Sequence, residues 1–194
     1  MTQFGDQKVH SMSKTPPTLE TERLRLRGHR YEDLADCVAM WGDPLVTRYI
    51  GGKPSTESQT WARLQAYVGH WVMLGFGYWV IESRDDGQFV GEVGVADFKR
   101  DIAPEMRGYP EIGFALASAF HGRGIAIEAS RAVLAWTDAH LSSTRTVCLI
   151  NPENIASRKV AEACGYRMFA NGTFNEQPVL FLERFSNRNL GQSS

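Results

Sequence analysis

The chain has 194 residues, of which 43% are hydrophobic and 22% are charged, and its formal net charge at pH 7 is -1. This length suits one domain with a sizeable core, and the near-neutral balance argues against a nucleic-acid-binding protein, which needs a basic face to neutralise phosphates. The sequence contains no apolar run of the roughly 18 residues that a membrane-spanning helix requires.

The two ends of the chain are predicted to lie outside the fold. Residues 1–17 are polar, lack the apolar middle of a signal peptide and include Pro16-Pro17. We therefore expect a disordered tail over residues 1–17, a domain over residues 18–186 and a short tail over residues 187–194. Three scattered cysteines show neither a disulfide framework nor metal-ligand spacing with the five histidines. Free thiols without an export signal favour a cytoplasmic protein, and we expect no bound metal.

Hydrophobic periodicity along the rest of the chain predicts a mixed α/β domain built on one sheet. The expected strands cover residues 22–28, 76–81, 89–96, 111–117, 144–150, 166–170 and 179–185. The expected helices cover residues 31–41, 57–73, 125–140 and 155–163. Pattern alone thus predicts the order strand, two helices, three strands, helix, strand, helix and two strands, without an internal repeat or a linker.

Turn residues separate these elements. Pro44 disfavours helical geometry at Asp43 and so ends the first helix. Asp86-Gly87 and Asn171-Gly172 are hairpin turn signals. In the helix over residues 57–73, one stripe of apolar residues is expected to face the core: Trp61, Leu64, Val68 and Trp71.

The segment over residues 114–126 (FALASAFHGRGIA) places a buried strand before a glycine-rich loop that opens a helix. Gly122 and Gly124 lack a Cβ, so the backbone there can turn tightly and approach a ligand closely. The amides from Gly122 to Ala126 would be the unpaired donors of a helix N-terminus, which suits a pyrophosphate, and Arg123 would add charge. The alternative is a tight strand-to-helix turn that needs glycine for steric reasons alone. The sequence has no P-loop, dinucleotide-binding or nucleophile-elbow motif.

A second segment over residues 151–165 (NPENIASRKVAEACG) follows another expected strand. Asn154 and Ser157 are three residues apart and so share one face near the start of a helix. Short polar side chains at such positions are often caps. Capping would explain one of the two residues, but not the parallel with the first strand–loop–helix segment.

Together the two segments resemble the GNAT superfamily of N-acetyltransferases. The run HGRGIA at residues 121–126 is similar to the family signature Q/R-x-x-G-x-G/A, with His121 at a position where Gln or Arg is usual. The run from Asn154 to Tyr166 is similar to the helix and strand that follow in that family. LETERLRLRGHRYEDL and GYPEIGFALA are similar to the branch that contains the ribosomal-protein N-terminal acetyltransferases, and the resemblance spans residues 19–185.

The resemblance implies the acyl-CoA N-acyltransferase fold, with a central mixed, mostly antiparallel sheet, two splayed parallel strands and helices on both faces. It implies acetyl-CoA as the co-substrate, with the pyrophosphate on the amides of residues 122–126 and the pantetheine arm along the strand at residues 114–116. The implied cofactor-binding residues are Phe114, Ala115, Leu116, His121, Gly122, Arg123, Gly124, Ile125, Ala126 and Asn154. The implied reaction is acetyl transfer to a primary amine by direct attack in a ternary complex. Homodimers are frequent in the resembling branch.

Two residues are candidate catalytic groups. An amine acceptor with a pKa near 10 is mostly protonated at neutral pH, so a base must take its proton. Glu111, at the start of a strand near which some family members carry a catalytic glutamate, is the candidate. Glu92, Asp97 and a water chain are its rivals, and an ion pair with a surface arginine such as Arg107 is the structural alternative. Ser157 is the candidate donor to the leaving thiolate, with a helix-cap role as its alternative.

Other functions and acceptors stay open at this stage. A CoA-binding sensor without turnover would need no base, and the presence of Glu111 weighs against it. A different acyl-CoA is another alternative. The acceptor ranges from a protein N-terminus to a small-molecule amine. The region that usually forms the acceptor cleft contains several aromatic residues, none of which the sequence singles out: Trp41, Tyr49, Trp61, Tyr67 and Trp71.

Overall fold

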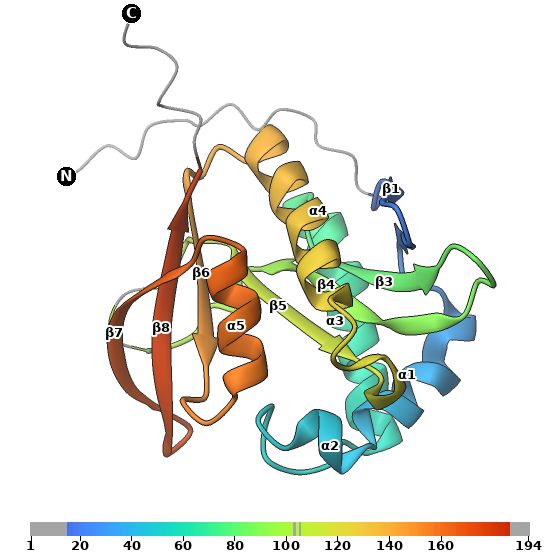
Figure 1. The fold of residues 1–194 in the computed structure, drawn as a ribbon, viewed down its shortest axis with the longest axis horizontal. Coiled ribbons are helices and arrows are strands. Elements are labelled where there is room, and N and C mark those ends of the chain that lie inside the picture. The colour runs from blue at the N-terminus through green and yellow to red at the C-terminus, as the bar shows by residue number, and fades with distance from the viewer. Residues whose placement is uncertain (1–14, 103, 105, 187–194) are drawn as a thin grey trace, which may run out of the picture.

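The computed structural model describes residues 15–102, 104 and 106–186, which contain one eight-stranded sheet (Figure 1). Its spatial order is β1-β2-β3-β4-β5-β6-β8-β7. The strands are β1 (Leu19–Glu20), β2 (Leu24–Arg27), β3 (Tyr78–Ser83), β4 (Phe89–Ala96), β5 (Glu111–Leu116), β6 (Arg145–Ile150), β7 (Arg167–Phe174) and β8 (Gln177–Phe185). Neighbouring strands are antiparallel except β5 and β6, which are parallel.

Helices cover both faces of this sheet. They are α1 (Leu34–Trp41), α2 (Pro44–Thr47), α3 (Glu57–Leu74), α4 (Ile125–His140) and α5 (Ile155–Ala163), with short 3-10 turns η1 (Tyr31–Asp33) and η2 (Ser118–Phe120). On one face of β5, Ala115 packs with Trp41 of α1 and Leu64 of α3. On the other face, Leu116 packs with Ala129 of α4. The predicted fold class is therefore confirmed. Within the described part of the chain, no helix is both long and apolar enough to cross a membrane.

Local signals explain where the helices begin and end. Thr56 and Gln59 form a reciprocal capping box at the start of α3, and Gly75 ends that helix with φ 72°. α1 ends before Asp43, as predicted. Pro44 does more than stop it, because it occupies the first position of α2, whose N-cap Asp43 accepts a hydrogen bond from the Leu45 amide.

The predicted core stripe of α3 was half wrong. Leu64 and Trp71 are buried, but Trp61 is 39% exposed and Val68 is 48% exposed. The buried residues of this helix are Thr60, Leu64, Tyr67 and Trp71. Trp61 instead stacks edge-on against Tyr31 near the surface. The face that contacts the sheet is thus rotated by about one residue from the stripe that apolar content favoured.

The predicted turn at Asn171-Gly172 was also wrong, because both residues lie inside β7. The chain reverses at Asn175 and Glu176, which adopt the left-handed conformation with φ 49° and 63°. Two residues with positive φ between paired antiparallel strands are typical of a type I′ hairpin. Glutamate at the second position gives no sequence signal for this turn.

The expected tail boundary falls inside the packed structure. Residues 1–14 and 187–194 lie outside the described residues. At the N-terminal edge of the described residues, the indole Nε1 of buried Trp79 donates a 2.8 Å hydrogen bond to the carbonyl oxygen of Pro17. The residues that contact the domain therefore begin before residue 18.

The parallel strands β5 and β6 part soon after they meet. They pair at Glu111 and Val147, where the Val147 amide donates to the Pro110 carbonyl. Beyond this point β6 continues alongside β8, while β5 stays with β4. The sheet is therefore open between the C-terminal parts of β5 and β6.

Candidate active site

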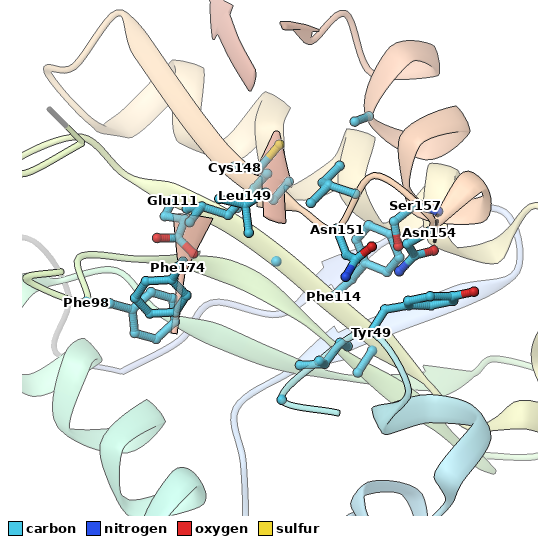
Figure 2. A pocket seen from close by; sticks show the side chains of 18 of the residues that line it. Tyr49, Phe98, Glu111, Phe114, Cys148, Leu149, Asn151, Asn154, Ser157 and Phe174 are labelled. Carbon is cyan, nitrogen blue, oxygen red and sulfur yellow. Dashed lines mark hydrogen bonds between the residues drawn. The ribbon is translucent and has the colours of Figure 1, made fainter. Parts of the chain in front are cut away.

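A cleft of about 640 Å³ lies at the opening between β5 and β6 (Figure 2). Glu111 faces it near Phe98 and Phe174, while Ser157 faces it from the far end, near Asn154. The walls also include Tyr49, Phe114, Cys148, Leu149 and Asn151. The two catalytic candidates predicted from the sequence therefore line the same cleft from opposite ends.

The edge of β5 that faces the opening has free backbone groups. In an antiparallel pair, alternate residues direct their N–H and C=O groups at the partner strand. The Ala117 amide donates to Val90 of β4, so Leu116 and Phe114 direct their backbone groups the other way, towards β6. The ring Nε2 of His121 lies 2.9 Å from the Leu116 carbonyl oxygen. The backbone groups of Phe114 have no strand partner among the described residues and face the cleft.

The glycine-rich loop forms the start of α4. Gly122 and Gly124 have φ 74° and 76°, and Gly124 is the N-cap of the helix. Within the described residues, the backbone amides from Gly122 to Ala126 donate to no acceptor. The positive φ values explain why glycine stands at both positions, and the free amides form the donor set of a helix N-terminus.

Side chains around the loop hold its backbone in place through hydrogen bonds and ring contacts. Arg23 donates a 3.0 Å hydrogen bond to the carbonyl of Arg123 and pairs with Glu128 of α4. The guanidinium of Arg123 lies over the Phe120 ring. Ile125 and Ala126 are buried under the first turn of α4. Arg23 was not singled out in the sequence, because its contacts join residues about 100 positions apart.

Asn154 and Ser157 have different roles at the start of α5. Asn154 is the N-cap, since its Oδ1 accepts a 3.0 Å hydrogen bond from the Ser157 amide. The Ser157 hydroxyl has no hydrogen-bond partner among the described residues. Both residues line the cleft. Capping thus accounts for Asn154 but not for the Ser157 hydroxyl.

Glu111 is held by Arg100 and not by Arg107. Arg100 Nε lies 2.7 Å from Oε2 of Glu111, and Arg100 Nη2 lies 2.9 Å from Oε1. Arg107 pairs with exposed Asp101 instead. An ionised carboxylate has about four lone-pair sites, so this pair leaves each oxygen with capacity for another donor. Sequence reasoning missed Arg100, which lies in a loop of polar pattern.

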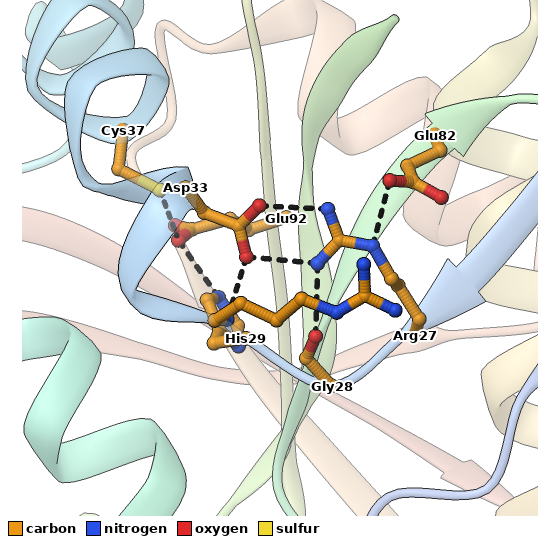
Figure 3. Close-up of polar contacts among 8 residues, drawn as sticks. Arg27, Gly28, His29, Asp33, Cys37, Glu82 and Glu92 are labelled. Carbon is orange, nitrogen blue, oxygen red and sulfur yellow. Dashed lines mark hydrogen bonds and ion pairs between the residues drawn. The ribbon is translucent and has the colours of Figure 1, made fainter. Parts of the chain in front are cut away.

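The rival bases occupy different surroundings. Glu92 of β4 is fully buried and accepts a hydrogen bond from Trp41 Nε1 at 2.8 Å. It also accepts one from Cys37 Sγ at 3.3 Å (Figure 3). The ring Nε2 of His29 lies 2.9 Å from the same carboxylate. Asp97 pairs with Lys99 near the surface. Glu111 lines the cleft, whereas these two carboxylates do not.

Three further polar groups line the cleft but stay protonated at neutral pH. Burial raises the pKa of the Cys148 and Cys164 thiols. Burial also raises the pKa of Tyr166, whose hydroxyl donates a 2.7 Å hydrogen bond to Thr146. Because the thiolate is the nucleophilic form, neither cysteine is ready to accept an acyl group.

The aromatic region between β2 and β3 contributes part of the opposite wall. Trp41, Tyr49 and Tyr67 line the cleft, whereas Trp61 and Trp71 do not. Arg63 of α3 also lines it, with its guanidinium 3.8 Å from the centroid of the Trp41 ring. Sequence reasoning named these aromatics without choosing among them and missed Arg63.

Known proteins with this arrangement are similar to the chain in sequence and in shape. The acetyltransferase (GNAT) domain profile matches residues 23–167. The chain is 30% identical over 172 residues to uncharacterized protein YkkB of Bacillus subtilis. The aligned region covers 87% of this chain and 95% of YkkB. The chain is also 30% identical over 163 residues to FsC-acetyl coenzyme A-N(2)-transacetylase of Aspergillus fumigatus. That aligned region covers 78% of this chain and 66% of the relative. The solved acetyltransferase of Agrobacterium tumefaciens superposes with a TM-score of 0.77 at 26% identity, covering 94% of this chain and all of that one (100%).

Proposed function

This chain belongs to the GNAT family of acetyltransferases, and from that premise we propose that it transfers the acetyl group of acetyl-CoA to a primary amine by direct attack in a ternary complex. The observation that carries the proposal is the free backbone edge at Phe114 next to the free amides that open α4. An extended chain of amide groups binds such an edge as an added strand does, and a pyrophosphate suits a helix N-terminus. One ligand with both features is coenzyme A.

The residues proposed to bind acetyl-CoA follow from this placement. The pantetheine arm would lie along Phe114, Ala115 and Leu116, and its pyrophosphate would lie on the amides from Gly122 to Ala126. Asn154 would contact the arm through the side-chain amide nitrogen, since its oxygen caps α5. His121 would close the end of the strand, where its ring meets the Leu116 carbonyl. Acetyl-CoA supplies the thioester whose carbonyl carbon the amine attacks.

Glu111 is the proposed general base. A carboxylate in the cleft, acting directly or through a water, takes a proton from the acceptor ammonium so that the neutral amine can attack. The bidentate contact with Arg100 fixes the Glu111 side chain while leaving lone pairs on both oxygens. Glu111 passes this first proton to water, the new C–N bond forms at the acetyl carbon, and the nitrogen then loses its second proton to the regenerated carboxylate.

Ser157 is the proposed proton donor to the leaving group. When the tetrahedral intermediate collapses, the C–S bond breaks and the sulfur leaves with the electron pair. The Ser157 hydroxyl lies in the cleft without a partner among the described residues, so it can pass a proton to the leaving sulfur and regain one from water. Tyr166, another hydroxyl residue in the lining of the cleft, already donates to Thr146. Because both cleft thiols are held protonated, direct attack is favoured over an acyl-cysteine intermediate.

A thiol-release assay tests this function. The protein is mixed with acetyl-CoA and a panel of small amines and N-terminal peptides, and free CoA is measured alongside the acetylated product by mass spectrometry. We expect CoA release that requires an amine and that falls when succinyl-CoA replaces acetyl-CoA. Binding of acetyl-CoA by calorimetry without turnover on any amine would favour a sensor instead.

A further inference from the structure

Among the described residues, the charged side chains that line the cleft carry a net positive charge. They are Arg48, Arg63, Arg100 and Glu111, which are three guanidinium groups and one carboxylate. Arg100 already holds that carboxylate through both oxygens. Since an opposite charge lowers the energy of a bound ion and a like charge raises it, this lining favours an anionic ligand over a polycation.

Arg63 is the cation that lacks an acidic partner. It makes no ion pair with a described residue, and its guanidinium carbon lies over the Trp41 ring, 3.8 Å from the ring centroid. Its hydrogen-bonded neighbour is the Tyr67 hydroxyl. The Nε–H is buried and meets no acceptor among the described residues. A guanidinium that is stacked, partly desolvated and short of acceptors is suited to a planar oxyanion such as a carboxylate.

Arg63 and Glu111 lie close to the same tyrosine. The rings of Tyr67 and Tyr78 stack with centroids 4.2 Å apart and an interplanar angle of 6°. Burial raises the pKa of Tyr78, with Glu111 adding to this effect and Arg63 opposing it, so both charges act on one hydroxyl. The Arg63 guanidinium, the two stacked tyrosines and the proposed base all line the same cleft.

We propose that the acceptor is a small primary amine that also carries a carboxylate, with its carboxylate on Arg63 and its amine directed to Glu111. The inference rests on the proposed acetyl transfer and names the acceptor class for the same cleft. Arg48, which lies over the Tyr49 ring at the exposed rim, adds longer-range attraction for the same charge. Polyamines and other polycationic amines would meet three arginines and, among the described residues, no carboxylate that is free of an arginine partner.

The first test compares matched acceptors on the parent protein. Each of several α-amino acids is assayed against its own carboxamide and against the amine that lacks the carboxyl carbon, with spermidine as the polycation. We expect kcat/KM to be at least about tenfold higher for the acid, since one charge-assisted bidentate contact is lost in the others. Converting the carboxylate to a carboxamide lowers the pKa of the α-amine, so more of it is free base at neutral pH and this bias works against the expected result. The amine that lacks the carboxyl carbon has a higher pKa, so the carboxamide is the decisive comparator. Equal or better rates with the carboxamides or spermidine would overturn the inference.

The second test assigns the preference to Arg63. Arg63→Gln should lower kcat/KM for the acid about tenfold or more and leave kcat/KM for the carboxamide unchanged. The preference for the acid over the carboxamide is then lost. Arg63→Lys, which keeps the charge but not the two parallel N–H donors of the guanidinium, should retain part of the preference for the acid. Arg25→Gln, at an exposed arginine on β2, is the matched control and should change neither rate. A preference that survives in folded Arg63→Gln would contradict the assignment.

A binding measurement separates this inference from the proposed function. Calorimetry with CoA-loaded protein compares an N-acetylated amino acid with its amide, and we expect the acid to bind about tenfold more tightly in the parent only. If no amine is acetylated, the proposed function fails and the acceptor class fails with it. If the acid and the amide are acetylated and bound alike, acetyl transfer stands and the inference about the carboxylate is wrong.

Discussion

Arg100 holds both oxygens of the Glu111 carboxylate while its guanidinium contacts two aromatic rings. The centroids of Phe98 and Phe174 are 4.6 and 4.7 Å from the guanidinium carbon. Burial opposes the charge on Arg100 and the pair with Glu111 favours it, with the net effect that the pKa of Arg100 is raised. Arg100 therefore stays charged through any practical assay range, and changes of rate with pH must come from other groups. Because Phe174 belongs to β7, the same contact ties the β7–β8 hairpin to the first residue of β5.

Glu111→Gln tests the general base. The amide keeps the shape of the side chain but cannot take a proton, so we expect kcat/KM to fall by about 10²- to 10⁴-fold. The acidic limb of the pH profile should disappear with it. The measurement is the pH dependence of kcat/KM for variant and parent on the best acceptor. A variant that keeps both the rate and the acidic limb would show that Glu111 is not the base.

Glu92→Gln is the matched comparison on the neighbouring strand. Glu92 accepts hydrogen bonds from Trp41 and Cys37, and an amide group would place N–H donors against at least one of them. We expect a lower melting temperature and an acidic limb that is retained. Loss of that limb in a folded Glu92→Gln protein would move the role of base to Glu92.

Ser157→Ala and Asn154→Ala should separate catalysis from capping. Asn154 accepts the hydrogen bond that caps α5, so Asn154→Ala should cost about 1 kcal/mol in the free energy of unfolding. Ser157→Ala should leave that free energy almost unchanged and lower kcat instead, because only the thiolate loses a donor. Urea denaturation and saturating kinetics on both variants provide the measurement. Full turnover in Ser157→Ala would mean that its hydroxyl has no part in the reaction.

Gly124→Val tests the backbone cradle for the pyrophosphate. Gly124 has φ 76°, a conformation that costs a residue with a Cβ about 1–2 kcal/mol. The substituted loop should shift and weaken acetyl-CoA binding by about tenfold or more. Gly87, with φ 73° in the β3–β4 turn, provides a control of equal strain far from the loop in sequence. Gly87→Val should lower stability similarly and leave the dissociation constant of acetyl-CoA unchanged. Equal affinity in folded Gly124→Val would contradict the proposed cradle.

Most elements were predictable because their signals are local. α4 and α5 have the predicted bounds, since Gly124 opens one and Gly165 follows the other with φ 87°. The buried face of α3 was not predictable in the same way. Two adjacent rows of residues on that helix both contain large apolar side chains. Packing against the sheet buries the row that contains Tyr67 and leaves Trp61 39% exposed. Which row is buried depends on the sheet, which periodicity within the helix does not describe.

The parts of the site that consist of backbone groups were predictable from the sequence, whereas the side chains that complete it were less so. The glycine loop and the strand before it are contiguous in sequence, so their spacing is informative. The partner of Glu111 is not, because Arg100 and Arg107 share one polar loop and only the path of that loop decides which arginine reaches the carboxylate. Arg63 was missed for a related reason. A single arginine on a helix is usually solvated, and only the fold places this one over Trp41 in the cleft.

A buried ion pair beside α1 should make stability depend on pH. Arg27 donates to both oxygens of Asp33, at 2.8 and 2.7 Å, and to Glu82 at 2.6 Å (Figure 3). The Arg30 amide donates to the same carboxylate. Burial opposes the charge on Asp33, but these donors outweigh it, so the pKa of Asp33 is lowered in the folded protein.

Asp33→Asn should therefore destabilise the protein at neutral pH but not in acid. Since the folded-state pKa lies below the unfolded value of about 3.9, the carboxylate stabilises the fold fully above that pH. The stabilisation is lost as the pH falls through the folded-state pKa. At neutral pH we expect the variant to lose about 3 kcal/mol of unfolding free energy, because Arg27 keeps a buried charge with half of its partners. Urea titrations from about pH 7 downward should show the difference between the two proteins narrowing once the pH falls below about 3.9. Asp101→Asn removes a pair of similar length on an exposed carboxylate and should follow the parent throughout. A difference between Asp33→Asn and the parent that stays constant into the acidic range would show that the charge of Asp33 does not carry the effect.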